Sequence, residues 1–369
     1  MSAEEDRLFM RRALRLAARA SGRTAPNPMV GALVVKDGEI VGEGFHRRAG
    51  EAHGERIAIE RAGERAKGAT LYLNLEPCVH QGRTPPCVDA VIAAGVARVV
   101  AAMRDPDPRV DGKGARALRA AGIEYESGVL EPQARRLNEG FVSRVTRGRP
   151  FVLLKLATTL DGRVAVSGRR YLSGKAALKE VHRMRDRADA VMVGVGTVLA
   201  DDPELTVREV RGRDPLRVVL DADARTPPAA KVVRSGDPQR TIVFVARDAD
   251  QRHAKRLRDA GVLVATLPRA EPVGRRASGT SAGPEGLDVG AGLRWLAEHG
   301  VNTVLSEGGP RVAASLLRAK LVDRIAFIVT PVAGGEGPLA IEGLPHAVEL
   351  GAMHTRRLGA DLLLEAEIA

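Results

Sequence analysis

The chain has 369 residues, a length that favours two domains over one, and 44% of them are hydrophobic. Lys and Arg (57) exceed Asp and Glu (46) by +11, but aromatic residues make up only 3%, too few for the stacking platforms of single-strand nucleic-acid binders. We therefore expect no nucleic-acid partner and no membrane span, and we interpret the chain as a cytoplasmic protein whose positive charge attracts phosphorylated small molecules.

The first part of the chain alternates helix and strand patterns. Asp37-Gly38 predicts a tight hairpin between strands over residues 30–35 and 39–43. An apolar stripe predicts a helix over residues 8–18. Together the patterns indicate an α/β domain whose strands are mostly parallel after the hairpin. Further strands are expected at residues 70–75, 98–102 and 123–127, and further helices at 54–62, 88–94 and 115–121.

A second α/β pattern follows the basic stretch over residues 144–150, which we interpret as a linker. Residues 269–290 are rich in Gly, Pro, Ser and Ala, and we expect a flexible surface loop there. The strands are predicted at residues 151–157, 190–193, 217–220, 241–245, 262–265, 303–305 and 324–329, and the helices at 175–185, 251–260, 293–298 and 312–319.

Three potential zinc ligands are spaced at the predicted ends of elements in the first part. His53 precedes a predicted helix, and Cys78 and Cys87 flank the turn between a strand and the next helix. A hydrolytic zinc site takes three protein ligands and leaves the fourth position for water. Helix N-terminal N–H groups would favour a thiolate at Cys78. The spacing predicts one zinc ion bound by these three residues.

Glu55 is the candidate for the carboxylate that a zinc deaminase keeps outside the ligand set to move protons. The pattern therefore favours removal of an amino group from a nucleobase-like ring. Two alternatives stay open from the residues alone: the cysteines are small buried hydrophobic residues, or they form a disulfide.

Two glycine-bearing turns stand out in the second part. One is Gly194-Val195-Gly196-Thr197 after a predicted strand, and the other is Glu307-Gly308-Gly309-Pro310 before a predicted helix. Glycines at a helix N-terminus let backbone N–H groups approach a phosphate, although ordinary loop glycines are an equal alternative. Neither turn is a Rossmann fingerprint, because the third glycine and the acidic residue are missing.

Read together, these motifs resemble the bifunctional riboflavin-biosynthesis deaminase/reductase family along nearly the whole chain. The eight residues between the two cysteines discriminate it from cytidine deaminases, which typically have two there. The resemblance is found in Pro26-Asn27-Pro28-Met29-Val30-Gly31, His53-Gly54-Glu55, Glu76-Pro77-Cys78, Gly82-Arg83-Thr84-Pro85-Pro86-Cys87, Leu154-Lys155-Leu156-Ala157, Thr197-Val198-Leu199-Ala200-Asp201-Asp202-Pro203, Leu205-Thr206-Val207-Arg208 and Glu307-Gly308-Gly309-Pro310.

The resemblance implies a cytidine-deaminase-like α/β/α domain over residues 1–146 and a dihydrofolate-reductase-like α/β domain over residues 147–369. It implies zinc-dependent hydrolytic deamination of 2,5-diamino-6-ribosylamino-4(3H)-pyrimidinone 5′-phosphate. NADPH would then reduce the ribose of 5-amino-6-(5-phosphoribosylamino)uracil to ribityl. It also implies a homo-oligomer.

The resemblance assigns residue roles position by position. In the first domain it makes His53, Cys78 and Cys87 the zinc ligands and Glu55 the catalytic proton shuttle. Its deaminase substrate positions are Asn27, His46, His80 and Arg83, and its reductase substrate positions are Lys155, Arg169, Arg185, Leu205, Arg208 and Glu307. The NADPH positions are Ala157, Tyr171, Thr197, Asp201, Ala222, Gly309, Pro310, Arg311, Val312, Ala313, Ala314 and Ser315.

The sequence departs from the family pattern at a few positions. Gly54 replaces a usual alanine, residues 166–173 are one residue short with Tyr171 in place of Trp, and Ala222 replaces a serine often used for the cofactor. These departures motivate an alternative, a deaminase with a degenerate, non-reducing second domain. Without the resemblance, Arg185 reads as a solvated charge on a helix.

Overall fold

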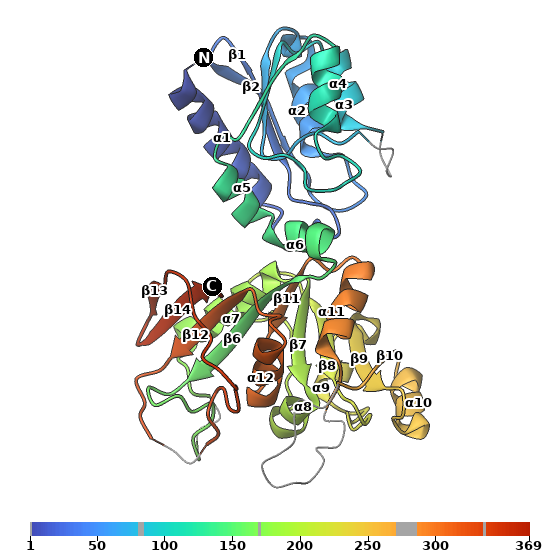
Figure 1. The fold of residues 1–369 in the computed structure, drawn as a ribbon, viewed down its shortest axis with the longest axis vertical. Helices are drawn as coiled ribbons and strands as arrows, with labels where there is room; N and C mark the ends of the chain where they lie inside the picture. The colour runs from blue at the N-terminus through green and yellow to red at the C-terminus, as the bar shows by residue number, and fades with distance from the viewer. Residues whose placement is uncertain (1, 80–84, 169–170, 271–285, 335–336) are drawn as a thin grey trace. The chain divides into compact units, whose positions relative to one another are not determined.

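A computed structural model describes residues 2–79, 85–168, 171–270, 286–334 and 337–369. The chain divides into two compact units, Met1–Arg149 and Pro150–Ala369, each built on its own sheet (Figure 1). Helices pack against both faces of each sheet. The predicted α/β class is confirmed for both units.

The first unit has a five-stranded sheet in the order β2-β1-β3-β4-β5. Strand β1 is antiparallel to β2 and β3, and β3, β4 and β5 are parallel. Asp37 and Gly38 turn the β1–β2 hairpin with φ angles of 51° and 81°, so the predicted hairpin is confirmed. The strands are β1 (Gly31–Lys36), β2 (Glu39–Phe45), β3 (Thr70–Leu73), β4 (Arg98–Ala101) and β5 (Glu124–Ser127).

In the described part of this unit, six α-helices cover the two faces of the sheet. One hydrophobic core joins it to α2 (Gly54–Ala62), α3 (Cys87–Ala93) and α4 (Lys113–Ala120). The other core joins it to α1 (Ala3–Ala18), α5 (Glu131–Leu137) and α6 (Glu139–Arg147), and a 3-10 turn follows α2 at Gly63–Ala66.

The linker predicted over residues 144–150 is wrong for its first half, because α6 continues to Arg147. Phe141 of this helix is buried in the core with α1, and the Ser143 hydroxyl donates to the Arg149 carbonyl at 2.8 Å. Gly148 ends the helix with φ 64°, a conformation that glycine adopts without steric cost. The basic residues on the solvent side masked this amphipathic pattern in the sequence.

Glycines bring the first turn of α2 directly onto the sheet. A Cβ atom on Gly44 of β2 would lie 2.5 Å from the Gly54 carbonyl oxygen and 2.7 Å from the Ile57 Cβ. A Cβ on Gly54 would lie 2.8 Å from the Val30 carbonyl oxygen. This close approach places residues 53–55 at the end of β1 and β2, where the site described below is found.

The second unit has a nine-stranded sheet in the order β10-β9-β8-β7-β11-β6-β12-β14-β13. Strands β10 through β12 in this order are parallel, and β14 and β13 extend the sheet antiparallel. The strands are β6 (Phe151–Thr158), β7 (Ala190–Gly194), β8 (Leu216–Leu220), β9 (Thr241–Ala246), β10 (Leu263–Leu267), β11 (Thr303–Ser306), β12 (Arg324–Val329), β13 (His354–Leu358) and β14 (Asp361–Glu367).

The helices of the second unit lie on both faces of the sheet. Helices α7 (Lys175–Arg187), α8 (Val195–Asp201), α9 (Lys231–Arg234) and α10 (Gln251–Asp259) share one core, and α11 (Val289–Glu298) and α12 (Pro310–Arg318) share the other. A 3-10 turn lies at Pro238–Arg240. Among the described residues, none of the helices of either unit combines the length and apolar character that a membrane crossing requires.

Several predicted boundaries differ from the structure. Most of the loop expected at residues 269–290, namely 271–285, lies outside the described residues, and its last two positions are the start of α11. Strands β13 and β14 were not predicted, because β13 is an edge strand with exposed polar side chains. Helices α5, α8 and α9 are too short to display a helical apolar period.

Candidate functional site

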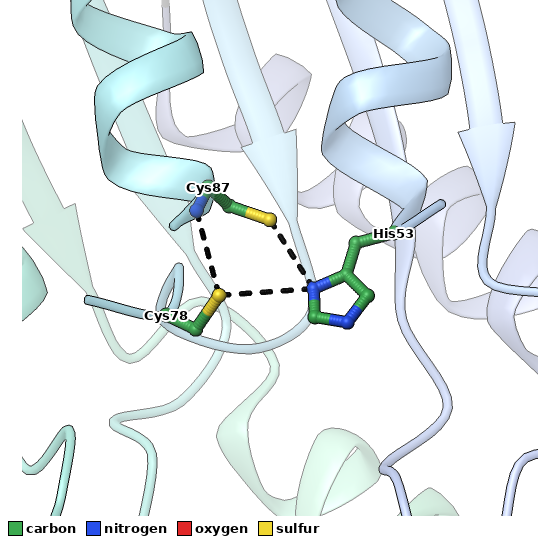
Figure 2. Close-up of side chains that lie close together, drawn as sticks. All are labelled: His53, Cys78 and Cys87. Carbon is green, nitrogen blue, oxygen red and sulfur yellow. Dashed lines mark hydrogen bonds between the residues drawn. The ribbon is translucent and has the colours of Figure 1, made fainter. Parts of the chain in front are cut away.

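His53, Cys78 and Cys87 come together in the first unit with their side chains pointing toward one another (Figure 2). His53 is the N-cap of α2, Cys87 is the first residue of α3, and Cys78 lies in the segment after β3. The His53 Nδ1 atom is 3.2 Å from the Cys87 Sγ and 3.7 Å from the Cys78 Sγ. All three donor atoms lie within 4.8 Å of one another.

This arrangement fits a tetrahedral zinc ion. With Zn–S of about 2.3 Å and Zn–N of about 2.1 Å, a nitrogen and a sulfur ligand lie about 3.6 Å apart. The two measured nitrogen–sulfur distances of 3.2 and 3.7 Å bracket that value. Both cysteines are free, so the disulfide alternative is wrong.

The first residue of α3, Cys87, and His53 together stabilise Cys78 as a thiolate. The backbone N–H of Cys87 donates to the Cys78 sulfur at 3.4 Å. The hydrogen bond from the Cys87 thiol, aided by His53 and by this N–H, lowers the pKa of Cys78 against the opposing effect of burial. The N–H group at the helix N-terminus contributes as predicted, but the hydrogen bond from the Cys87 thiol contributes more.

Glu55 lies in the first turn of α2, two residues after His53. Its side chain is buried, with 2% exposure, and Oε2 has no hydrogen-bond partner among the described residues. Burial raises the pKa of Glu55. The charge of His53 lowers this pKa, and the charge of Cys78 raises it. A buried carboxyl oxygen without a partner, beside three soft metal donors and outside their set, is what a proton-transferring acid requires.

Two of the four predicted deaminase substrate residues adjoin the metal cluster. The His46 ring lies 5.0 Å from the His53 ring, edge to face. His46 Nδ1 donates to the Ala52 carbonyl at 3.1 Å, so its Nε2 accepts from the Asn27 amide at 3.1 Å. Burial lowers the pKa of His46, which favours this neutral form. His80 and Arg83 lie outside the described residues.

Glu76 supports the site and was not singled out in the sequence. Its carboxylate accepts three backbone N–H groups, from Asp105 at 3.2 Å, Gly112 at 3.0 Å and Ala115 at 3.0 Å. Glu76 therefore ties the N-terminus of α4 to the segment that carries Cys78. An acidic residue at the buried end of a strand was the available signal, because such a residue needs several donors.

In the second unit, Lys155, Arg185 and Glu307 form a buried charge cluster. Arg185 binds the Glu307 carboxylate with two hydrogen bonds, Nε to Oε1 at 2.6 Å and Nη2 to Oε2 at 3.0 Å. Lys155 Nζ lies 3.8 Å from Glu307 Oε2. Arg185 is 8% exposed, so its interpretation as a solvated charge is wrong.

The charges of this cluster compensate one another. Burial alone would raise the pKa of Glu307, but Arg185 and Lys155 outweigh it and hold the pKa at about 2. Burial lowers the pKa of Lys155, and Glu307 partly offsets that effect. A carboxylate with two cations leaves one net positive charge at this place, which suits an anionic ligand.

Leu205 and Arg208 lie in the segment next to this cluster. Leu205 is buried with a φ of 58°, a left-handed conformation that costs a non-glycine residue roughly 1–2 kcal/mol. Arg185 Nη1 donates to the Thr206 carbonyl at 3.0 Å, which links the segment to the charge cluster. The Arg208 side chain is 42% exposed and lies 3.6 Å from Glu204. Arg169 lies outside the described residues.

Most predicted NADPH positions lie at the carboxyl ends of neighbouring parallel strands. Ala157 is near the end of β6, Ala222 follows β8, and Thr197 and Asp201 are on α8, directly after β7. A Cβ on Gly309, the N-cap of α12 after β11, would lie 3.5 Å from Thr197 Oγ1, so the two helix starts are adjacent. Within the described part of the chain, no side chain caps either helix start.

The remaining NADPH positions differ in exposure. Pro310 begins α12, and the next residues form its first turns, with two alanines buried and Arg311 exposed: Arg311, Val312, Ala313, Ala314 and Ser315. Tyr171 is 59% exposed and directly follows residues 169–170, which lie outside the described residues. The structure thus places Tyr171 on the surface, in a segment between β6 and α7.

Two family models match the chain. A cytidine and deoxycytidylate deaminase zinc-binding region matches residues 3–103, and a RibD C-terminal domain matches residues 150–364. The riboflavin biosynthesis protein RibD of Aquifex aeolicus is 41% identical over 371 residues, 99% of this chain and 99% of the relative. RibD of Escherichia coli is 39% identical over 381 residues, 98% of each.

Solved structures agree with these relatives. RibD of Acinetobacter baumannii superposes with a TM-score of 0.87 at 34% identity, over 100% of both chains. A diaminohydroxyphosphoribosylaminopyrimidine deaminase/5-amino-6-(5-phosphoribosylamino)uracil reductase of Thermotoga maritima gives a TM-score of 0.84 at 35% identity, over 100% of this chain and 99% of that one. The two matching domains and the full-length relatives show that the chain belongs to the RibD family of bifunctional deaminase/reductases of riboflavin biosynthesis.

Proposed function

We propose that residues 1–146 deaminate 2,5-diamino-6-ribosylamino-4(3H)-pyrimidinone 5′-phosphate and that residues 147–369 reduce the ribose of 5-amino-6-(5-phosphoribosylamino)uracil with NADPH. These reactions match the two activities for which the Thermotoga maritima relative is named. The observation that carries the proposal is the cluster of His53, Cys78 and Cys87 beside the buried carboxyl group of Glu55.

In the deaminase domain, His53, Cys78 and Cys87 would hold one zinc ion per chain. When bound, zinc supplies the Lewis acidity that activates water for attack on the ring carbon bearing the amino group. Glu55 would take one proton from the attacking water and give it to the ring nitrogen, and it would then carry a second proton, from the added hydroxyl group, to the leaving amine. Burial raises the pKa of Glu55, and a higher pKa makes its carboxylate a better acceptor for the proton from water.

Asn27 and His46 would orient the pyrimidine ring in the same domain. The Asn27 amide is held by the neutral His46 ring, which is itself held by the Ala52 carbonyl. This chain of hydrogen bonds fixes the direction of the Asn27 amide next to the metal donors. His80 and Arg83 are proposed to contact the substrate as well.

In the reductase domain, Lys155, Arg185, Leu205, Arg208 and Glu307 would bind the ribosylated substrate, together with Arg169. The two hydrogen bonds between Arg185 and Glu307 would hold both side chains in one orientation beside the substrate. Lys155 and Arg208 would provide positive charges for the ribose and its phosphate. NADPH, bound at the starts of α8 and α12 and at Ala157, Tyr171, Ala222 and Asp201, would supply the hydride. The match of residues 150–364 gives the degenerate alternative no support.

We further propose that the partners are small phosphorylated pyrimidines in the cytoplasm, with neither nucleic acid nor membrane bound, and that the chain forms a homo-oligomer. The test of the whole proposal is product analysis by mass spectrometry. Full-length protein with zinc but without NADPH should stop at the deaminated intermediate, and added NADPH should yield the ribitylamino product. Intermediate that stays unreduced while NADPH remains at its initial concentration would contradict the reductase half.

A further inference from the structure

The segment from Leu205 to Arg208 has a backbone conformation that its own residues do not favour. Leu205 is buried with a φ of 58°, although leucine rarely adopts positive φ angles. Such a conformation persists only where neighbouring groups hold it. The neighbours of this segment therefore determine where Arg208 presents its guanidinium group.

Three side chains outside the segment hold its backbone. Arg185 donates from Nη1 to the Thr206 carbonyl at 3.0 Å. The Asp214 carboxylate accepts the Val207 N–H at 2.7 Å. The His182 ring accepts the Arg208 N–H at its Nδ1 atom, at 3.1 Å. His182 and Arg185 lie one turn apart on α7, so one helix face contributes two of the three contacts.

His182 is distinguished from the other two by its complete burial. Its exposed fraction is 0%, and its Nε2 atom has no hydrogen-bond partner among the described residues. Since Nδ1 accepts a backbone N–H, the neutral ring carries its proton on Nε2. Burial and the nearby charges of Arg185 and Arg208 lower the pKa of His182 to about 4, so the accepting form is maintained at neutral pH.

We propose that His182 is a positioning residue for the reductase substrate, and that its Nδ1 atom holds the Arg208 backbone so that the Arg208 side chain meets the substrate phosphate. This inference rests on the proposed reductase function. It goes beyond the expected binding residues, because His182 would act through Arg208 and would not touch the substrate itself.

The inference predicts a defect specific to phosphorylated substrate. In full-length His182→Ala protein, the KM for the phosphorylated intermediate should rise about five- to tenfold, the factor that corresponds to one lost hydrogen bond. The KM for the dephosphorylated intermediate should change little, and kcat should fall less than KM rises. A general loss of packing would raise the KM for both substrates alike.

A matched pair of amide variants tests the contact atom by atom. Asparagine places its carbonyl oxygen near the position of Nδ1, whereas glutamine places its amide near the position of Nε2. His182→Asn should therefore restore the phosphate preference, and His182→Gln should behave like His182→Ala. This pair keeps the test decisive even where the alanine variant folds poorly, and NADPH binding monitors the integrity of the domain.

The outcomes separate the inference from the function on which it rests. A wild-type protein that does not oxidise NADPH with the intermediate would refute the proposed reduction. Wild-type turnover with an unchanged ratio of the two KM values in His182→Ala, or equal rescue by glutamine and asparagine, would overturn the role of His182 alone. Rescue by asparagine only, confined to the phosphorylated substrate, would support it.

Discussion

The two units build their sites in opposite ways. In the first unit, soft donors gather from two short motifs, at the N-terminus of α2 and across the turn before α3. In the second unit, charged side chains meet from β6, α7 and the end of β11, which are separated by up to 152 residues between Lys155 and Glu307. The first site is a local pattern and the second is assembled by the sheet.

The two sites also differ in how their side chains are held in place. The metal site needs only three correctly placed side chains, those of His53, Cys78 and Cys87, and the distances between their donor atoms suit a zinc ion. The charge cluster depends instead on its own side chains, because each buried charge is compensated by the opposite charge beside it. Mutations should therefore affect activity in the first unit and both activity and folding in the second.

The largest expected effect is that of Cys87→Ser. Serine is a poor zinc ligand, so zinc content should fall well below one ion per chain and deamination should be lost. Reduction of supplied intermediate should persist, because the charge cluster lies in the other unit. Elemental analysis and a deamination assay measure the two effects. Full zinc occupancy in this variant would contradict the assignment of Cys87 as a ligand.

Glu55→Gln should separate metal binding from proton transfer. The amide has nearly the same shape but cannot take a proton, so deamination should slow by about 10²- to 10⁴-fold with zinc retained. Zinc content, deamination rate and reduction of supplied intermediate are the three measurements. Deamination at the wild-type rate would mean that another group moves the proton.

Arg185→Met should destabilise the second unit by about 3–5 kcal/mol, because it leaves the buried Glu307 carboxylate without its bidentate partner. Denaturant unfolding followed by the fluorescence of Trp295, the single tryptophan of the chain, reports on this unit. The matched control is Arg183→Met on the same helix, whose ion pair has a 48% exposed arginine and should contribute less than about 1 kcal/mol. Equal losses of unfolding free energy in the two variants would refute the conclusion that the buried ion pair of Arg185 contributes more than the exposed ion pair of Arg183.

Acid should remove the stability that Glu307 contributes. Its folded-state pKa of about 2 lies below its ordinary 4.5, so this contribution is present above pH 4.5 and is lost as pH falls toward 2. The loss should amount to about 3 kcal/mol. Unfolding of Glu307→Gln, which lacks the titrating group, should depend less on pH over this range. Parallel pH curves for the two proteins would show that the pKa of Glu307 is not depressed.

The predictable part of the fold consists of elements with a strong periodic pattern. The range predicted for α2 is the range observed, and β1, β2 and β12 lie within one or two residues of their predicted bounds. Helix α6 and strand β13 were missed, because basic or exposed polar side chains cover their solvent faces and hide the buried positions. Tertiary contacts, such as those of Phe141, determine these elements.

The metal donors, the nearby acid and the family could be predicted without a structure, because residue identity and spacing within two short motifs are enough to specify that chemistry. The burial of Arg185 against Glu307 and the hydrogen bond from the Arg208 N–H to His182 became visible only in the folded chain. The physical reason is that burial and pairing depend on which distant strands become neighbours in a sheet. A single arginine or histidine on a helix has no local signature of that environment.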